Sequence, residues 1–224
     1  MKKLVNIHTH SRDTGNESIS VVSRFVQEVS PQTEFDGPVS VGLHPWHINK
    51  VNVNEQLENL EAICDNPKML AVGECGLDRS VSVNIEKQKD IFLKQNEIAI
   101  AHDLPVIIHS VKSYSDFLAL LKQRLNKTPW IFHGFSGNFQ IAKRLIDFGA
   151  YISLGSALLK DFSKTNETMK KTTLQRIFLE TDEDDKANIE EIYRKASQLT
   201  GISYDEFTSQ IYQNFIFCFN YGVR

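Results

Sequence analysis

Residues 4–10 read LVNIHTH, an apolar run that ends in two histidines one residue apart. In an extended strand the side chains alternate, so residues i and i+2 leave the same face. His8 and His10 would therefore point to one side, opposite Val5 and Ile7. Two imidazoles side by side can share one cation, because imidazole nitrogen suits zinc and other transition ions. An isolated pair is more often two ordinary histidines, so a metal site requires ligands from elsewhere in the chain.

Seven further apolar, β-branched runs follow. They are Ser18–Val26, Val39–His44, Met69–Glu74, Pro105–His109, Trp130–His133, Ala150–Leu154 and Arg176–Thr181. Segments with apolar residues at 3–4 spacing lie between or after them, and these predict helices. The predicted helices are Asn54–Cys64, Glu86–His102, Ser113–Leu125, Phe139–Phe148, Asn188–Leu199 and Ser203–Phe219. Nearly continuous apolar strands that alternate with helices are typical of a parallel sheet buried on both faces.

Eight such strands in 224 residues predict an α/β fold, a (β/α)8 TIM-type barrel formed by a single domain over residues 1–224. The connection from Gln27 to Pro38 is short and carries two prolines, so we expect no full helix there and an irregular barrel between strands 2 and 3. A doubly wound open sheet is the alternative. It is disfavoured because no glycine-rich phosphate fingerprint follows the first strand.

Composition limits the classes of partner and location. The net charge of −3 disfavours a protein that coats nucleic acid or anionic membrane, but it allows an enzyme that meets nucleic acid briefly. The three cysteines, Cys64, Cys75 and Cys218, form no CxxC pair, so a reducing cytoplasm is expected. No apolar run approaches the roughly 20 residues of a membrane helix. We therefore expect a cytoplasmic protein with no membrane association and no implied protein partner.

Metal-compatible residues recur where the apolar runs end. In a TIM barrel the C-terminal ends of all strands open onto one face, where active sites are built. The residues at or just beyond these ends are His8, His10, His44, Glu74, His109, His133 and Asp182. Each has an ordinary explanation by itself; Asp182, for example, could cap a helix. Chance would have to place such residues at six of eight strand ends, which favours a functional interpretation.

The chemistry that such a set supports is metal-assisted hydrolysis. It holds too many ligands for one tetrahedral ion that keeps an open position, and it suits two ions about 3.5–4 Å apart. A glutamate can bridge two ions through its two oxygens. The ions would lower the pKa of a water molecule, and an aspartate beside that water could accept its proton.

Six motifs, NIHTH, GLHPW, AVGECGLD, LPVIIHS, IFHGFSG and FLETD, occur in the order found in TatD-type metal-dependent hydrolases. The resemblance extends from Leu4 to the helical tail, where LTGISYDEFTSQIYQNFIFCF is similar to the closing segment of that family. The family belongs to the amidohydrolase-like barrels, and its members are typically divalent-metal deoxyribonucleases. The resemblance thus implies a deoxyribonuclease that takes DNA as a transient substrate.

The resemblance also implies which residues bind two divalent ions, whether zinc, manganese or magnesium. The first ion would be held by His8, His10, Glu74 and Asp182, and the second by Glu74, His109 and His133. Glu74 would bridge the ions, and Asp182 would also act as the general base, so these two are the expected catalytic residues. The residues expected to contact substrate are His44, Lys112 and Ser136.

Three departures from the family pattern bear on the substrate. Asn6 stands where the first motif usually begins with an aspartate. Val111 replaces a substrate-facing arginine, although Lys112 adjoins it. The acidic stretch 183–186 replaces a proline and a longer substrate loop, and it is poorly suited to a polyanion. All expected ligands are present, so the sequence supports hydrolysis more strongly than it supports DNA as the substrate.

Two other interpretations therefore stay open. One is a metal-dependent hydrolase of an amide or ester outside nucleic acid. The other is a non-catalytic binding protein that kept the barrel, which the complete ligand set disfavours. Trp46 could stack on a base, although packing is the more common role of an aromatic beside proline. The lysines expected on a solvated loop after the seventh strand are Lys160, Lys164, Lys170 and Lys171.

Overall fold

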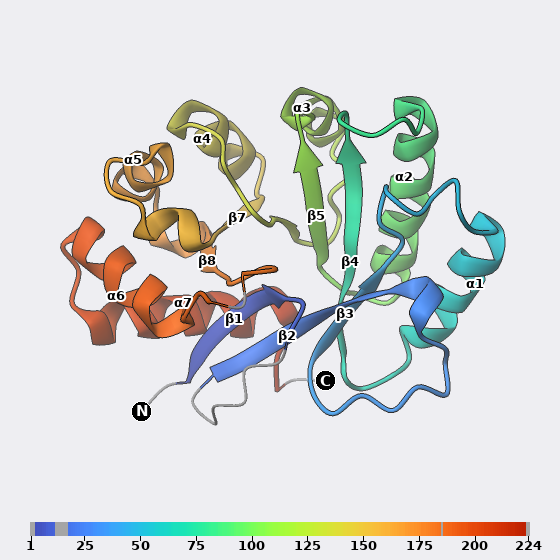
Figure 1. The fold of residues 1–224 in the computed structure, drawn as a ribbon, viewed down its shortest axis with the longest axis horizontal. Helices are drawn as coiled ribbons and strands as arrows, with labels where there is room; N and C mark the ends of the chain where they lie inside the picture. Colours follow the sequence, from blue (N-terminus) through green and yellow to red (C-terminus); the bar gives the residue numbers. More distant parts are fainter. Residues whose placement is uncertain (1–2, 12–17, 185, 223–224) are drawn as a thin grey trace. The chain divides into compact units, whose positions relative to one another are not determined.

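A computed structural model describes residues 3–11, 18–184 and 186–222. This part of the chain contains eight strands, which alternate with α-helices from β3 onward, and the order of the strands in the sheet, β1 to β8, is their order in the sequence (Figure 1). The pairings of β2 with β3, β3 with β4, β4 with β5 and β7 with β8 are all parallel. The fold is thus of the (β/α)8 TIM type, which confirms the predicted class.

The elements lie close to their predicted positions. The strands are β1 (Leu4–Thr9), β2 (Ser18–Phe25), β3 (Val39–Gly42), β4 (Met69–Asp78), β5 (Val106–Val111), β6 (Trp130–Phe132), β7 (Tyr151–Leu154) and β8 (Ile177–Leu179). The helices are α1 (Val53–Ile63), α2 (Ile85–Ala101), α3 (Tyr114–Lys122), α4 (Phe139–Asp147), α5 (Lys164–Lys171), α6 (Ile189–Thr200) and α7 (Tyr204–Phe219). Short 3-10 helices span Val26–Glu28, Ser156–Leu159 and Leu174–Arg176. Among the described residues, no helix combines the length and hydrophobicity needed to cross a bilayer.

One connection agrees with its prediction and one differs from it. The segment after β2 contains only the 3-10 helix Val26–Glu28, as predicted for the irregular connection. The segment after β7, expected to be a lysine-bearing loop, instead contains helix α5. Three of the four lysines assigned to that loop lie on α5, and the last turn carries Lys170 and Lys171, whose charge suits the C-terminal end of the helix dipole.

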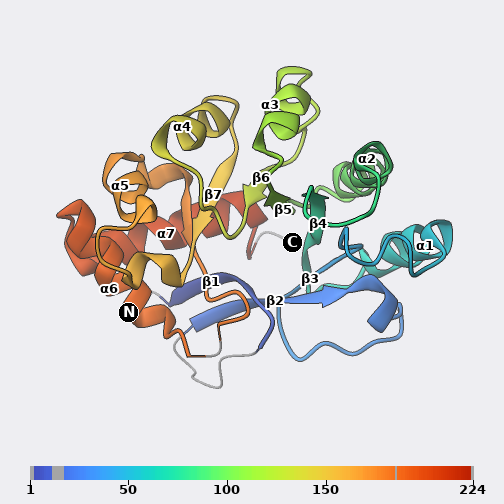
Figure 2. The ribbon, with the colours of Figure 1, turned by 45° about the horizontal axis from the view of Figure 1, so that its top comes forward.

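The chain divides into two compact units, residues 1–21 with 132–224 and residues 22–131, here called the first and second units. In the second unit, α2 packs on β4 and alongside α1 (Figure 2). Buried amide side chains of α2 hold the ends of two strands. Gln95 exchanges two hydrogen bonds with the backbone of Leu43, just after β3, and Gln88 exchanges two with the backbone of Asp78, the last residue of β4. These contacts fix the strand ends that carry the candidate site.

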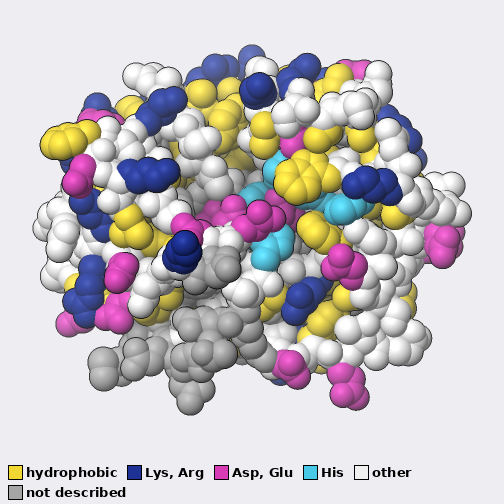
Figure 3. Space-filling view, viewed as in Figure 1, with side chains coloured by type: hydrophobic (Ala, Val, Ile, Leu, Met, Phe, Trp, Pro, Cys, Tyr) yellow, Lys and Arg dark blue, Asp and Glu magenta, His cyan; other side chains and the backbone are white. Residues whose placement is uncertain are grey.

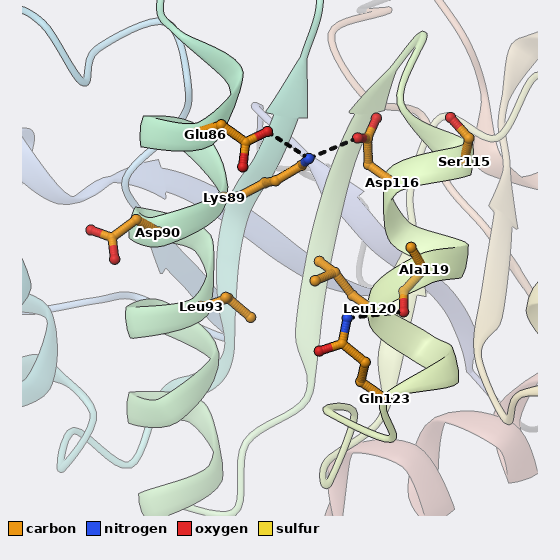
Figure 4. Close-up of a pocket in the computed structure, with 9 residues that line it drawn as sticks. All are labelled: Glu86, Lys89, Asp90, Leu93, Ser115, Asp116, Ala119, Leu120 and Gln123. Atoms are coloured by element: carbon orange, nitrogen blue, oxygen red, sulfur yellow. Dashed lines mark hydrogen bonds and ion pairs between the residues drawn. The ribbon is translucent and has the colours of Figure 1, made fainter.

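An ion-pair network joins α2 and α3 on the surface of the second unit. Lys89 lies between two carboxylates, with its Nζ 2.9 Å from Glu86 Oε1 and 3.0 Å from Asp116 Oδ1 (Figure 4). Arg79, directly after β4, donates two hydrogen bonds to Asp116. The Arg79 guanidinium, with a smaller contribution from Lys89, holds the pKa of Asp116 below its ordinary value.

In the first unit, buried hydrogen bonds anchor β1. The Tyr193 hydroxyl of α6 donates to the carbonyl of Val5 at 2.9 Å and accepts from its amide at 3.0 Å. Burial raises the pKa of this phenol, so it keeps the proton that it donates. Asn6 binds Thr181 twice, because its Nδ2 donates to the threonine hydroxyl and its Oδ1 accepts from the threonine amide. These bonds hold β1 beside the segment that follows β8.

Candidate metal centres

The second unit gathers three metal-compatible residues, one shortly after β3, one within β4 and one within β5. His44, Glu74 and His109 are buried, and their ligand atoms all lie within 4.8 Å of one another. Glu74 Oε1 is 2.7 Å from His109 Nδ1 and 3.2 Å from His44 Nε2. The predicted ligands Glu74 and His109 are therefore together, and they are joined by His44, which was expected to contact substrate.

Asp78, at the end of β4, determines which nitrogen of His109 faces Glu74. Burial would raise the pKa of Asp78, but hydrogen bonds from Ser80, Trp46 and His109 outweigh it and lower the pKa to about 2. The ionised carboxylate must accept from His109 Nε2, 3.2 Å away, so that nitrogen carries a proton. Nδ1 is then the nitrogen directed at Glu74. This is the carboxylate–histidine arrangement that orients metal-ligating imidazoles in proteins.

His44, unlike His109, turns its protonated ring nitrogen toward Glu74. The backbone amide of Trp46 donates to His44 Nδ1 at 3.2 Å, so the neutral ring carries its proton on Nε2. That nitrogen faces Glu74 Oε1 and donates to it. In this tautomer, His44 fixes the position of the Glu74 carboxylate and does not offer a lone pair to an ion.

The first unit gathers His8, His10 and Asp182, whose ligand atoms also lie within 4.8 Å of one another. Asp182 Oδ1 is 3.3 Å from His8 Nε2 and 3.7 Å from His10 Nε2. Backbone hydrogen bonds hold the three together, because the Asp182 amide donates to the His8 carbonyl and the His10 amide donates to the Asp182 carbonyl. The Asp182 side chain is 40% exposed, so solvent reaches it.

Asp182 has a φ of 54°, in the left-handed region that aspartate and asparagine tolerate better than most residues. Side chains that can bond to the nearby backbone reduce the cost of this conformation. The strained geometry is held by the two backbone bonds to β1, and it sets the direction in which the carboxylate leaves the chain.

His133 and Glu180 extend the cluster of the first unit. The His133 ring centroid is 4.2 Å from that of His8, and the ligand atoms of His133, Glu180 and Asp182 lie within 4.8 Å of one another. Glu180 is fully buried; its Oε1 accepts from the Gly134 amide and lies 3.6 Å from His133 Nδ1. Gly134, directly after His133, adopts a positive φ of 51° that glycine tolerates. The hydrogen bond from its amide to Glu180 holds this turn and thereby the direction of His133.

The two other residues expected to contact substrate lie outside these groups. Lys112 is exposed directly after β5 and has a φ of 52°. Ser136 is exposed in the turn before α4. In the acidic stretch 183–186, Glu183 and Asp184 are exposed, whereas Asp185 lies outside the described residues.

The residues present fit divalent metal ions. Each group combines imidazole nitrogens with carboxylate oxygens, the donor set preferred by zinc and accepted by manganese. A buried carboxylate such as Glu74 is costly unless it is paired or coordinates a metal. Sequence reasoning missed Asp78 and Glu180, although both stand inside quoted motifs, AVGECGLD and FLETD.

Comparison with known proteins places these groups in context. The YjjV protein of Escherichia coli K12, described as an uncharacterized metal-dependent hydrolase, is 33% identical over 150 residues, 65% of this chain and 58% of that protein. A Cronobacter turicensis protein named 3'-5' ssDNA/RNA exonuclease TatD is 36% identical over 118 residues, 51% of this chain and 44% of that protein. The matched region thus spans about half the length of these curated relatives.

A solved structure matches nearly the whole chain. The crystal structure of the YjjV protein, a TatD homologue from E. coli K12, superimposes with a TM-score of 0.81 at 25% identity, covering 97% of this chain and 98% of that one. The family model described as TatD related DNase matches residues 2–220. The chain therefore belongs to the TatD related DNase family.

Proposed function

We propose that this protein is a divalent-metal-dependent hydrolase that cleaves phosphodiester bonds, with DNA as its substrate. The observation that carries the proposal is the grouping of imidazoles with carboxylates within each unit. Family membership supports it, as does the nuclease named among the relatives. We further propose that it acts in the cytoplasm, which its few cysteines, three in number with no CxxC pair, support.

The proposed ligands are those predicted from the sequence, namely His8, His10, Glu74, His109, His133 and Asp182, with Glu74 shared between two ions. When bound, such ions supply Lewis-acid polarisation of the phosphate and lower the pKa of a water molecule. The close approach of His8, His10 and Asp182, and of Glu74 and His109, supports this ligand set.

The chain's own residues carry out the proton transfer and the positioning. Asp182 is the proposed base, because its carboxylate is partly exposed while its backbone is fixed to β1. Asp78 holds His109 with Nδ1 toward Glu74, and Glu180 holds the turn after His133. His44 donates to Glu74 and keeps that carboxylate oriented. Rigid side chains of this kind reduce the reorganisation needed during reaction.

A second candidate, hydrolysis of an ester or amide outside nucleic acid, is favoured by one set of observations. Val111 occupies the position of the family's arginine, and the stretch after Asp182 is acidic. On the face drawn in Figure 3, basic side chains are scattered and do not form one continuous patch. Proteins that hold long stretches of nucleic acid need such a patch. These features favour the second candidate over cleavage of a long duplex; if the substrate is DNA, they favour a short single strand.

The test is a substrate panel. Protein freed of metal with a chelator is assayed before and after addition of zinc, manganese or magnesium. The substrates are single-stranded DNA, bis-p-nitrophenyl phosphate, p-nitrophenyl acetate and a p-nitroanilide. Metal-dependent cleavage of the first two supports the proposal; cleavage of only the carboxylic ester or anilide supports the second candidate. His102→Gln is the matched control, because His102 lies at the end of α2 outside the ligand groups.

A further inference from the structure

Trp46 lies beside the His44–Glu74–His109 group and is held in one orientation. Its Nε1 donates to Asp78 Oδ2 at 2.8 Å, the same oxygen that lies 3.2 Å from His109 Nε2. Its ring meets that of His44 edge-on, with the ring centroids 4.6 Å apart. Despite these contacts the residue is 44% exposed. A large aromatic side chain that is fixed and yet solvent-accessible presents a preformed binding surface.

The exposed part of Trp46 borders an open pocket of about 390 Å³. The pocket is lined by Trp46, Asn49, Lys50, Val81, Ser82 and Val83. Its walls combine an aromatic ring with two valines, and Lys50 supplies a positive charge. A second lysine, Lys87, donates from Nζ to Asn49 Oδ1 at 2.8 Å and adds positive charge at the rim. The pocket therefore suits a flat, apolar ring that carries an anionic group.

We propose that Trp46 and this pocket form a subsite that stacks one nucleobase of a single-stranded DNA substrate. The inference rests on the proposed nuclease function, and it specifies how that site takes its substrate. Stacking on an aromatic side chain tolerates every base, because every base has a π-face. Lys50 and Lys87 would attract the phosphate attached to the stacked nucleotide, which partly compensates for the missing arginine at position 111.

The link through Asp78 makes the subsite continuous with the candidate metal centre. A single carboxylate oxygen of Asp78 contacts both the indole of Trp46 and the imidazole of His109. The stacked base would thus occupy a position fixed relative to a proposed metal ligand. Such a rigid connection sets the distance between the bound nucleotide and the bond to be cleaved.

The test compares two labelled probes on the chelator-treated protein, a thymidine pentanucleotide and an abasic pentanucleotide with the same phosphates. We expect the thymidine probe to bind roughly 10- to 100-fold more tightly, as measured by anisotropy. Trp46→Ala should abolish this preference, whereas Trp46→Phe should keep most of it because phenylalanine still stacks. Phe162→Ala, at a fully exposed aromatic residue in the first unit, is the matched control and should change nothing.

Intrinsic fluorescence gives an independent readout. The chain has two tryptophans, and Trp130 is completely buried. Quenching by the thymidine probe should therefore report on Trp46 and vanish in Trp46→Phe. Equal binding of both probes to the wild type, or an unchanged preference in Trp46→Ala, would overturn the subsite. If the base preference is missing but DNA is still hydrolysed, only the subsite is wrong. If the base preference is present but no phosphodiester is cleaved, the proposed function is wrong and the base-binding subsite stands.

Discussion

Asp182 Oδ1 lies 3.3 Å from His8 Nε2, although the two residues come from opposite ends of the chain. Their backbones are also bonded, since the Asp182 amide donates to the His8 carbonyl at 3.1 Å. The side chain of Asp182 is therefore a proton-accepting carboxylate next to the candidate ligand His8. Backbone hydrogen bonds fix its position. It is the arrangement expected of a base that works beside a bound ion.

Asp182→Asn tests the role of that carboxylate. Asparagine is nearly isosteric, tolerates the left-handed backbone and keeps an oxygen, but it cannot accept a proton at neutral pH. We expect normal folding and near-normal metal content with turnover reduced on the order of 10²- to 10⁴-fold. Metal analysis and a hydrolysis assay on one preparation check this. Wild-type turnover at normal metal content would show that Asp182 is not the base.

Asp78→Ala tests the orientation of His109. The change removes the acceptor of His109 Nε2 and Trp46 Nε1, so the imidazole loses its fixed tautomer. Loss of such a partner typically lowers metal affinity roughly 10- to 100-fold. Metal titration should show this loss in protein that remains folded by circular dichroism, with partial recovery in Asp78→Asn. Asp90→Ala, at an exposed carboxylate of α2, is the control, and a similar loss there would argue against a specific role for the contact with His109.

The buried hydrogen bonds of Tyr193 predict a stability effect in the first unit. Tyr193→Phe leaves the amide and carbonyl of Val5 without their hydroxyl partner. An unsatisfied buried polar group costs about 1–3 kcal/mol, so the free energy of unfolding in urea should fall by an amount in this range. Tyr212→Phe on α7 is the control, because no hydrogen bond of its hydroxyl is seen among the described residues. Equal effects of the two changes would contradict the assignment.

The network around Asp116 predicts a dependence of stability on pH. Its pKa is lowered in the folded protein, so the ionised form contributes stability above the unfolded value of 3.8, and this contribution is lost as pH falls through the folded pKa. Asp116→Asn should therefore destabilise the protein more at pH 7 than at pH 3. Unfolding curves at both values test this against Asp90→Asn, an exposed residue of α2. A cost independent of pH would point to packing rather than charge.

The strands were predictable because their residues are apolar and β-branched over nearly their whole length. Helix α5 was not, because its buried side chains are Thr165, Asn166, Thr168 and a single methionine, Met169. A helix with so few apolar residues has no hydrophobic period for sequence reasoning to detect. Its start is set by Ser163, whose hydroxyl accepts from the Asn166 amide, a signal common to many turns.

The candidate ligands could be named from the sequence because they stand within or just after apolar runs, whereas the residues that orient them could not. Asp78 and Glu180 act through contacts with His109 and the Gly134 turn, which only the folded chain brings together. Asn6, a departure from the family motif, retains a structural role because an amide can both donate to and accept from Thr181. An ionised aspartate could only accept there, so the change alters the polarity of the link without breaking it.

The most direct test of the central claim is the metal stoichiometry of the reconstituted protein by elemental analysis, compared with three variants. We predict two divalent ions per wild-type chain. Glu74→Ala should lose tight binding of both, because Glu74 is the only residue proposed as a ligand of both ions. His109→Ala and His133→Ala should each lose one. A wild-type protein that retains no metal, or equal losses in all three variants, would contradict a two-ion centre bridged by Glu74.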